Sequence, residues 1–467
     1  VSGQRLKMKF GVPLSLFFAA IMFANAALAH VSERALVLIL PTNIYIAFGV
    51  AAVAVTVFLT VFMPPWVFKP LGGDGRTIAA AQGALKPPIL PSLISFLVFF
   101  CLICLGLSGP RDPLQNLLPL TLFTVWWICF PLLQALLGDL WRWINPWDGP
   151  VHIVFKGRSY KNLPQQVGVW PAIASFFLAA VYTLTDLAPD DPDRLARVAG
   201  GYWLFTFIMC GIFGRDWLHR GEGFTVFFNL IAQLSPLRRK PFGVRFPGQI
   251  LIAQVPQGLS VATFAVVMLA LGSFDGLNET FWWMSQLGIN PLEFPGRSAI
   301  AWQNRFGMGG AIVVLTTGFA ACVWLGLALI GQTAYFQTLF CRLALSLLPI
   351  ALGYHFAHFL TSAMVNLQYF LAALNDPFET GATLLGWDSF YVTTSFFNQH
   401  HTVEAIWLTQ AGSIVLAHII AVVLSHMIAL NAFGDHQMAV ISQLPVAAFM
   451  LLYTVFGLWL LASPVAL

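Results

Sequence analysis

Histidines mark the part of this chain that could carry chemistry. Four of them lie within stretches that are apolar enough to cross a membrane: His355, His358, His418 and His426. Three further ligand-type side chains lie at the mouth of one such stretch: His400, His401 and Glu404. An imidazole in hydrocarbon is costly unless it is paired, hydrated or coordinated. We therefore expect a functional site in the last quarter of the chain.

The spacing of these residues suits a metal ion. His355 and His358 share one face if their segment is helical. A helix that begins near residue 400 likewise places Glu404 beside His400 and His401. Imidazole and carboxylate ligands are typical of divalent transition metals, here Zn, Mn, Co or Cu.

The two groups are joined by one loop, which predicts a common metal site near the outer rim of the bilayer. The predicted ligands are His355, His358, His400, His401 and Glu404. Glu404 would be a ligand or the general base of a catalysed reaction. The alternative is that these histidines lie at the membrane interface and hydrogen-bond water.

His418 and His426 are expected to lie deeper in the bilayer. They are two helical turns apart and share a face. They could bind a haem as a cofactor, or form a proton path toward Asp435 and His436. Each could instead donate a hydrogen bond to a backbone carbonyl at a helix interface, and the sequence leaves these alternatives open.

Composition fixes the fold class in which these residues are held. The 467 residues are 58% apolar and only 9% charged, and apolar runs long enough to span a bilayer recur. We predict an all-α, polytopic transmembrane helix bundle. About ten spans are expected: 40–63, 90–108, 117–137, 168–187, 200–214, 249–272, 307–331, 337–361, 404–430 and 445–463. Segment 224–234 is apolar but too short to cross, which predicts an interfacial or re-entrant helix.

The first residues resemble a secretory signal. Basic residues precede an apolar stretch at 12–24, and Ala27-Leu28-Ala29 matches a cleavage site. We predict a signal peptide or signal anchor over 1–29 and a single transmembrane domain over 30–467. Cleavage would make His30 the first residue, with an amine and an imidazole that suit Cu(II).

Charge in the loops predicts the topology. If the mature N-terminus lies outside and the spans alternate, most Lys and Arg residues fall in inside loops, and most acidic residues fall outside. This indicates a bacterial-type inner membrane protein with both termini extracytoplasmic. Loops 273–306 and 375–403 then lie outside, and their aromatic residues favour an interfacial belt or a lid over an apolar substrate site.

Composition also restricts the partners. The net charge is only +4, and no basic run alternates with aromatic residues, so no nucleic-acid partner is expected. The six cysteines fall in or beside predicted spans, which argues against a disulfide framework. The expected partners are the lipid bilayer and a small apolar substrate or a metal ion, and a partner subunit is compatible with the sequence.

Two motifs at the predicted inner face carry a family resemblance. WRWINPWD (141–148) and RDWLHRGEGFTVFFNLIAQLSP (215–236) combine Arg, Trp and acidic residues, which anchor helix ends or form a gate. Together with GYHFAHFL (353–360), they resemble the polytopic membrane proteins labelled fenitrothion hydrolase, from about residue 40 to the C-terminus. The resemblance implies cleavage of an organophosphate triester, and it assigns no catalytic residues.

Three functions are compatible with these observations. The first is a metal-dependent hydrolase that acts on apolar esters. The second is a membrane transporter for a metal ion or small solute, although the spans contain few carboxylates and no clear inverted repeat. The third is a redox subunit that holds haem or copper through histidines.

Overall fold

The computed structural model describes residues 37, 40–72, 88–239, 242–253, 257–293, 296–387 and 391–465. The predicted signal segment 1–29 and His30 lie outside these residues. The described chain is almost entirely helical, as predicted. Its strands are β1 (Leu237–Arg239) and β2 (Phe242–Val244), which form a small antiparallel pair.

Nine helical segments of the described chain are long and apolar enough to cross a membrane. They are α2 (Thr42–Phe62), α5 (Ile89–Ser108), the continuous run α6 (Leu117–Pro119), η2 (Leu120–Cys129) and α7 (Phe130–Leu137), α11 (Pro192–Phe213), α15 (Leu259–Asn278), α17 (Arg297–Leu329), the run η5 (Thr333–Tyr335), α18 (Phe336–Leu343), η6 (Ala344–Leu347) and α19 (Leu348–Asn375), α20 (His400–Phe433) and α21 (His436–Ala462). This confirms a polytopic membrane helix bundle.

Shorter helices fill the connections and the bundle interior. They are η1 (Pro65–Val67), α3 (Lys69–Gly72), α8 (Trp141–Ile144), α9 (Asp148–Phe155), η3 (Gln165–Val167), α10 (Trp170–Thr185), α12 (Asp216–Arg220), α13 (Gly223–Ala232), α14 (Gln249–Ala253), α16 (Phe281–Gln286), η4 (Pro291–Glu293) and η7 (Ser395–Asn398). Helix α13 corresponds to the predicted short apolar segment 224–234, and α10 corresponds to the fourth predicted span.

Helix α10 has 16 residues, which gives a length of about 24 Å. It nevertheless joins the two ends of the bundle. At its start, the Val169 N–H donates to Ser260 Oγ at the beginning of α15. At its other end it meets the beginning of α17. Nine of the ten predicted spans thus correspond to helices of spanning length in the described chain, and the predicted span 168–187 corresponds to the shorter helix α10.

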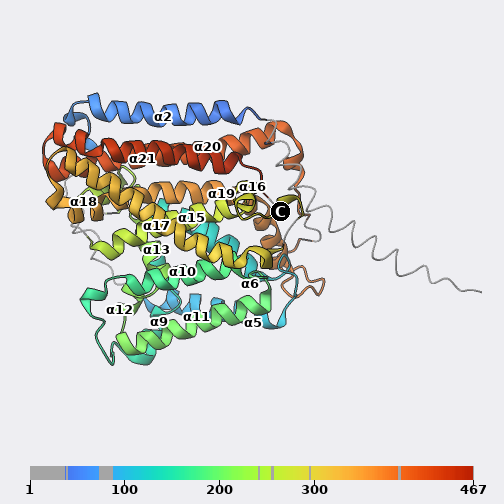
Figure 1. Cartoon of the computed structure of the whole chain (residues 1–467). Coiled ribbons are helices and arrows are strands. Elements are labelled where there is room, and N and C mark those ends of the chain that lie inside the picture. Colours follow the sequence, from blue (N-terminus) through green and yellow to red (C-terminus); the bar gives the residue numbers. More distant parts are fainter. Residues whose placement is uncertain are drawn as a thin grey trace, which may run out of the picture.

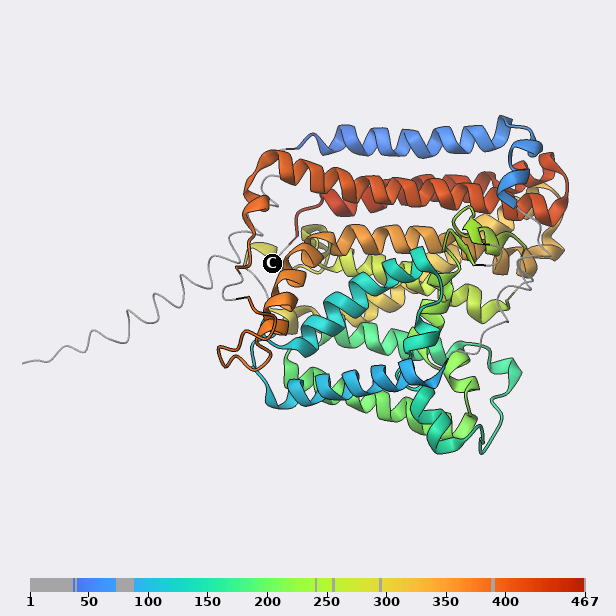
Figure 2. The ribbon, with the colours of Figure 1, turned by 180° about the vertical axis from the view of Figure 1, so that it is seen from behind.

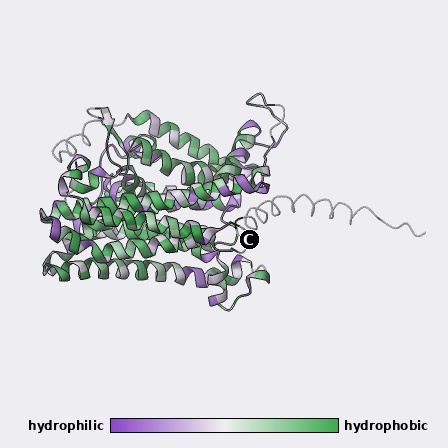
Figure 3. Cartoon of the chain, turned by 90° about the horizontal axis from the view of Figure 1, so that it is seen from above, coloured by the Kyte–Doolittle hydropathy of each residue, from purple (hydrophilic) through white to green (hydrophobic). Residues whose placement is uncertain are grey.

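Hydrogen bonds near helix ends define these two ends of the bundle. At one end, His436 Nε2 donates to the Val61 carbonyl oxygen, and Arg342 donates to Asn431 Oδ1. The opposite end carries Asp186. After the predicted topology, we call the end with Asp186 the outer end and the end with His436 the inner end. Hydrophilic residues gather at both ends while the helix shafts are apolar (Figure 3). Helices α2, α20 and α21 lie along one side of the bundle, and α5 and α11 along the opposite side (Figure 1).

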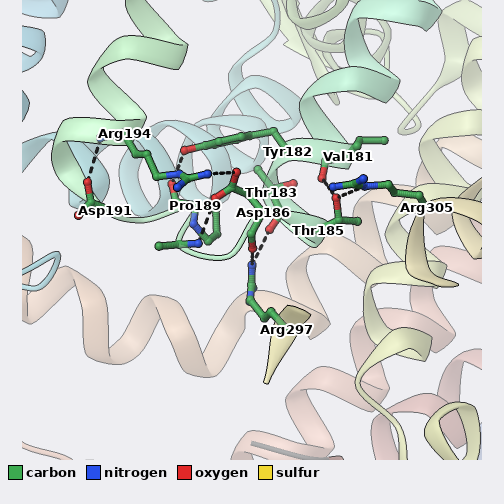
Figure 4. Close-up of polar contacts among 11 residues, drawn as sticks. Val181, Tyr182, Thr183, Thr185, Asp186, Pro189, Asp191, Arg194, Arg297 and Arg305 are labelled. Atoms are coloured by element: carbon green, nitrogen blue, oxygen red, sulfur yellow. Dashed lines mark hydrogen bonds and ion pairs between the residues drawn. The ribbon is translucent and has the colours of Figure 1, made fainter. Parts of the chain in front are cut away.

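A polar network closes the outer end between α10, α11 and α17 (Figure 4). Arg194 forms an ion pair of 2.7 Å with Asp186, and Arg297 donates to the Asp186 carbonyl oxygen. Arg305 Nε donates to Thr185 Oγ1 at 3.1 Å. Burial favours the neutral acid, but a backbone hydrogen bond and the Arg194 guanidinium hold the pKa of Asp186 below its ordinary value. These contacts fix where α17 begins.

Several helices extend beyond the predicted spans. The predicted loop 273–306 is largely helical, because α15 continues to Asn278, α16 follows, and α17 begins at Arg297. Helix α19 continues to Asn375 instead of ending near 361. Charged and polar side chains made these stretches resemble loops, but in the structure several of them pair with neighbouring helices, as Asp275 does with His358 and Arg305 with Thr185.

Candidate functional site

The first turns of α20 bring together three of the predicted metal ligands. His400 and His401 are exposed and Glu404 is half-buried. One ligand atom from each lies within 4.8 Å of the others. It is the one group of three or more such side chains in the part of the chain that the structure describes. Two imidazoles and a carboxylate form a ligand set used by catalytic zinc sites, which leaves a position for water.

Helix α2 supplies a second layer to this group. The Tyr45 hydroxyl donates to Glu404 Oε1 at 2.9 Å. The Tyr45 ring packs on Trp407, with ring centroids 5.3 Å apart. Trp407 is only 1% exposed, so this contact anchors Tyr45 to a rigid part of the bundle. A hydrogen bond to a ligating carboxylate orients it and tunes its affinity.

His355 and His358 do not join this group. Gln410 Nε2 donates to the Ala357 carbonyl oxygen at 2.7 Å, which sets the level of α19 against α20. Glu404 precedes Gln410 by six residues, so it lies about 9 Å further along the helix axis. The structure therefore does not bring the five predicted ligands into one coordination sphere. The physical reason is the continuation of α19 past residue 361, which places its histidines deeper than expected.

His355 and His358 have other partners. His358 Nε2 lies 3.1 Å from Asp275 Oδ2 of α15. His355 Nε2 lies 2.9 Å from the Trp127 carbonyl oxygen. A carbonyl oxygen only accepts, so this nitrogen of His355 carries the proton. These contacts place a histidine–carboxylate pair and a second imidazole within the spanning helices.

Both histidines face a cavity of about 1670 Å³. Its wall includes Trp127 and Phe227 toward the inner end, and Asp275, His358 and Trp407 toward the outer end. Two further residues of the wall, Gly276 and Tyr354, are packed closely against one another. A Cβ at Gly276 would lie 1.8 Å from Tyr354 Oη, so any side chain there would have to displace the buried Tyr354 ring. The cavity exceeds the usual volume of a site for a drug-sized ligand.

His418 and His426 are both buried and lie apart from the two groups above. His418 Nδ1 donates to the Ile414 carbonyl oxygen of its own helix at 2.8 Å, and its Nε2 has no hydrogen-bond partner. The His426 ring lies 5.7 Å from the His436 ring and 4.9 Å from Phe68. The His426 ring thus lies beside His436, while a proton path or haem binding by His418 or His426 stays a prediction.

The inner-face motifs build a buried network around Glu222. This carboxylate accepts hydrogen bonds from Tyr202 Oη and from the N–H and Oγ1 of Thr225, and it caps α13. Asn145 and Trp141 of the first motif donate to the same Thr225 hydroxyl. Burial raises the pKa of Glu222 above its ordinary value, although the hydrogen bonds from Thr225 and Tyr202 oppose that shift. The arrangement fits helix anchoring.

Three residues near the candidate sites were not identified from the sequence. Asp275 was placed in a loop, yet the helical pattern of α15 continues through it and ends only at Asn278. Tyr45 and Trp407 looked like ordinary residues of apolar spans. Their importance depends on contacts between distant helices, which residue spacing does not reveal.

Comparison with protein-family models, with curated proteins and with solved structures finds no match to this chain. The resemblance to fenitrothion hydrolase-type proteins therefore stays a prediction, and function has to be argued from the site.

Proposed function

We propose that this integral membrane protein is a metal-dependent hydrolase of small apolar esters of the organophosphate type. The observation that supports the proposal is the approach of His400, His401 and Glu404 to within 4.8 Å at the start of α20. A divalent ion held there, such as Zn, Mn, Co or Cu, would lower the pKa of a bound water and polarise a phosphoryl oxygen.

The side chains have distinct roles in this proposal. His400 and His401 bind the ion through neutral imidazoles. Glu404 is the third ligand or the general base, and Tyr45 orients it through the 2.9 Å hydrogen bond. The exposure of both histidines admits water to the site.

The cavity is the proposed source of substrate. Trp407 belongs to its wall and lies one helical turn from Glu404. The metal group and the cavity therefore share the outer part of α20. An apolar ester held in the cavity would have its polar group near this end.

A transporter is the second candidate, and the His358–Asp275 pair favours it. Ionisable residues within spanning helices commonly mark substrate or proton pathways. The pair lies in the cavity wall. Proteoliposomes with an imposed pH gradient would test this function: solute uptake that is lost in Asp275→Asn, without any hydrolysis, would favour transport over the hydrolase.

We also propose the membrane in which the protein resides and its orientation. The charge pattern of the loops supports a bacterial-type inner membrane with both termini extracytoplasmic and a signal segment at 1–29. A redox subunit that binds haem through His418 or His426 would show a Soret band in the spectrum of the purified protein.

Hydrolysis of diethyl 4-nitrophenyl phosphate by the full chain in lipid nanodiscs tests the proposal. We expect a chelator to abolish hydrolysis and Zn²⁺ to restore it. His401→Ala should lower the rate by more than about 100-fold, because even partners of metal ligands account for 10–100-fold. His152→Ala, at an exposed histidine of the inner end, is the matched control. Unchanged hydrolysis after chelation or in His401→Ala would refute the metal-dependent mechanism.

A further inference from the structure

Two polar side chains of the cavity wall offer hydrogen-bond acceptors to a ligand. One is Asp275 of α15 and the other is His355 of α19. They lie close together, because His358 follows His355 on the same face of α19 and is 3.1 Å from Asp275 Oδ2. The centroid of the Phe359 ring is 4.9 Å from that of His355 and 4.6 Å from that of His358. Asp275, His355 and His358 therefore form one polar patch of the wall.

The neighbouring helix fixes the proton of the His355 imidazole. Segment η2 is wound as a π-helix and runs beside α19 (Figure 2). Pro131, in the first turn of α7, has no N–H, so the Trp127 carbonyl four residues earlier lacks the donor that an α-helix would supply. His355 Nε2–H donates to this carbonyl instead, at 2.9 Å. The neutral ring then has a lone pair on Nδ1, and this nitrogen can only accept a hydrogen bond.

The acceptor atoms of the polar patch are within reach of a ligand. Asp275 Oδ2 contacts His358, whereas Asp275 Oδ1 accepts no hydrogen bond from the described chain. His355 Nδ1 likewise has no partner in the part of the chain that the structure describes. The buried polar atoms that lack a partner there include neither atom, so both have accessible surface. The Asp275 side chain as a whole is 18% exposed. A ligand with hydrogen-bond donors would therefore satisfy the patch.

The charge of the wall favours a cationic donor. The charged side chains of the described wall are three acidic and one basic, namely Asp190, Asp275, Glu279 and Arg297. The guanidinium of Arg297 already donates to the carbonyl oxygens of Thr183 and Asp186. The wall stays negative even when His358 carries a proton. A carboxylate among spanning helices is costly without a compensating charge, and a positively charged ligand supplies that charge.

The aromatic part of the wall suits an apolar body. Trp126, Trp127 and Phe224 are half-buried and belong to the wall. The Trp127 ring lies 5.3 Å from the His355 ring, between centroids, so the aromatic part adjoins the polar patch. Aromatic faces attract cations as well as apolar groups. The cavity thus combines acceptors, negative charge and aromatic surface in one place.

We propose that the cavity binds a lipophilic ammonium ion. Its N–H groups donate to Asp275 and to His355 Nδ1, and its apolar body lies against Trp126 and Trp127. This ligand goes beyond the proposed hydrolysis and does not rest on it, because the metal group at the start of α20 takes no part in the binding. A neutral ester has neither an N–H donor nor a charge, so it would find no match at the polar patch.

Binding of a fluorescent amine to the chelator-treated full chain in lipid nanodiscs tests the proposal. The probe is dansylcadaverine, a primary amine that is protonated at neutral pH, and empty nanodiscs correct for its partition into lipid. Its N-acetyl derivative keeps the dansyl body but has no charge. Its trimethylammonium analogue keeps the charge but has no ammonium N–H. We expect saturable binding of the amine, binding of the trimethylammonium analogue that is weaker by about tenfold or more, and still weaker binding of the acetylated probe.

Variants of Asp275 test whether the amine binds at the polar patch. Asp275→Asn removes the charge but keeps an acceptor for His358, so the Kd of dansylcadaverine should rise by about tenfold or more. Asp275→Glu keeps the charge and should bind the amine more tightly than Asp275→Asn does. Glu293→Gln removes the same charge from an exposed glutamate of η4 outside the wall and should bind as the parent does.

Each comparison has an outcome that contradicts the proposal. Equal Kd values for the amine and its acetylated form would overturn the selection by charge, and equal values for the amine and the trimethylammonium analogue would overturn the N–H contacts. Unchanged binding in Asp275→Asn, or an equal loss in Glu293→Gln, would overturn the assignment to the polar patch. The three probes are compared on the parent chain, so that comparison is decisive even if a variant does not fold. Absence of saturable binding by the parent would overturn the whole proposal.

Discussion

Two glutamates of this protein occupy opposite kinds of environment. Glu222 at the inner end is completely buried, and donors from Tyr202, Phe224 and Thr225 satisfy its carboxylate. Glu404 at the outer end is half-buried, accepts one hydrogen bond from Tyr45, and lies beside two exposed imidazoles. A carboxylate whose acceptor capacity is filled by the protein stabilises the fold. A carboxylate grouped with exposed ligands can bind an ion.

The comparison shows that burial of a charged group does not by itself identify a functional site. Glu222 is the more deeply buried residue, yet it caps α13 and its donors belong to α11 and α13, so it holds these helices together. The chemistry is expected where side chains of ligand type are close together and accessible to solvent.

Removal of the Glu222 carboxylate should have the largest effect on folding. Glu222→Ala leaves buried donors of Thr225 and Tyr202 without an acceptor, and each costs about 1–3 kcal/mol. We expect the free energy of unfolding to fall by about 3 kcal/mol or more. Denaturation in detergent measures this loss. Glu293→Ala, at an exposed glutamate of η4, is the control. Equal stability of the two variants would show that the Glu222 network does not anchor the helices.

Removal of one hydroxyl should weaken the metal group without unfolding the protein. Tyr45→Phe deletes the hydrogen bond to Glu404 and keeps the ring on Trp407, so metal affinity should fall by about tenfold. Isothermal titration with Zn²⁺ measures the change. Tyr391→Phe, at a tyrosine that is 83% exposed, should bind as the parent does. If Tyr45→Phe also binds as the parent does, Tyr45 has no role in orienting Glu404.

The raised pKa of Glu222 predicts how stability depends on pH. Folding raises this pKa, so the folded state holds its proton more tightly than the unfolded state does. The resulting stabilisation is complete below the ordinary value of 4.5 and is lost as the pH rises through the folded-state value. Relative to Glu222→Gln, which has no such proton, the parent should therefore lose stability as the pH is raised from about 4 to about 8. Parallel curves for the two proteins over that range would contradict the shift.

Exposed ion pairs of the outer end should contribute least. Arg197 and Asp193 form a 2.6 Å pair in which the arginine side chain is 70% exposed. Arg197→Ala should lower the free energy of unfolding by less than about 0.5 kcal/mol. The measurement is the same denaturation in detergent. A loss as large as that of Glu222→Ala would remove the distinction between the buried network of the inner end and the exposed charges of the outer end.

Much of the fold could be predicted from hydropathy and span length, because a helix in lipid satisfies its backbone only internally. The errors are at polar residues. Asp275 and Arg297 looked like loop residues, yet each lies in a helix and has a polar partner there. Asp275 contacts the His358 imidazole, and Arg297 donates to carbonyl oxygens at the end of α10. Averaged hydropathy does not include such partners.

The candidate site was predictable only where it is local. His400, His401 and Glu404 share one helix, so their spacing predicts their proximity. Convergence with His355 required the ends of two helices to be known, and α19 is longer than predicted. The contribution of Tyr45 depends on packing across 359 positions of sequence, which no spacing rule reaches.

Titration of the metal-free protein with Co²⁺ tests the central claim most directly, because the visible bands of the ion report its coordination. We predict one ion per chain, with bands that disappear in the variant His400→Ala/His401→Ala and persist in the variant His355→Ala/His358→Ala. Retention of the bands when His400 and His401 are replaced, or their loss only when His355 and His358 are replaced, would contradict the assignment of the metal centre to the start of α20.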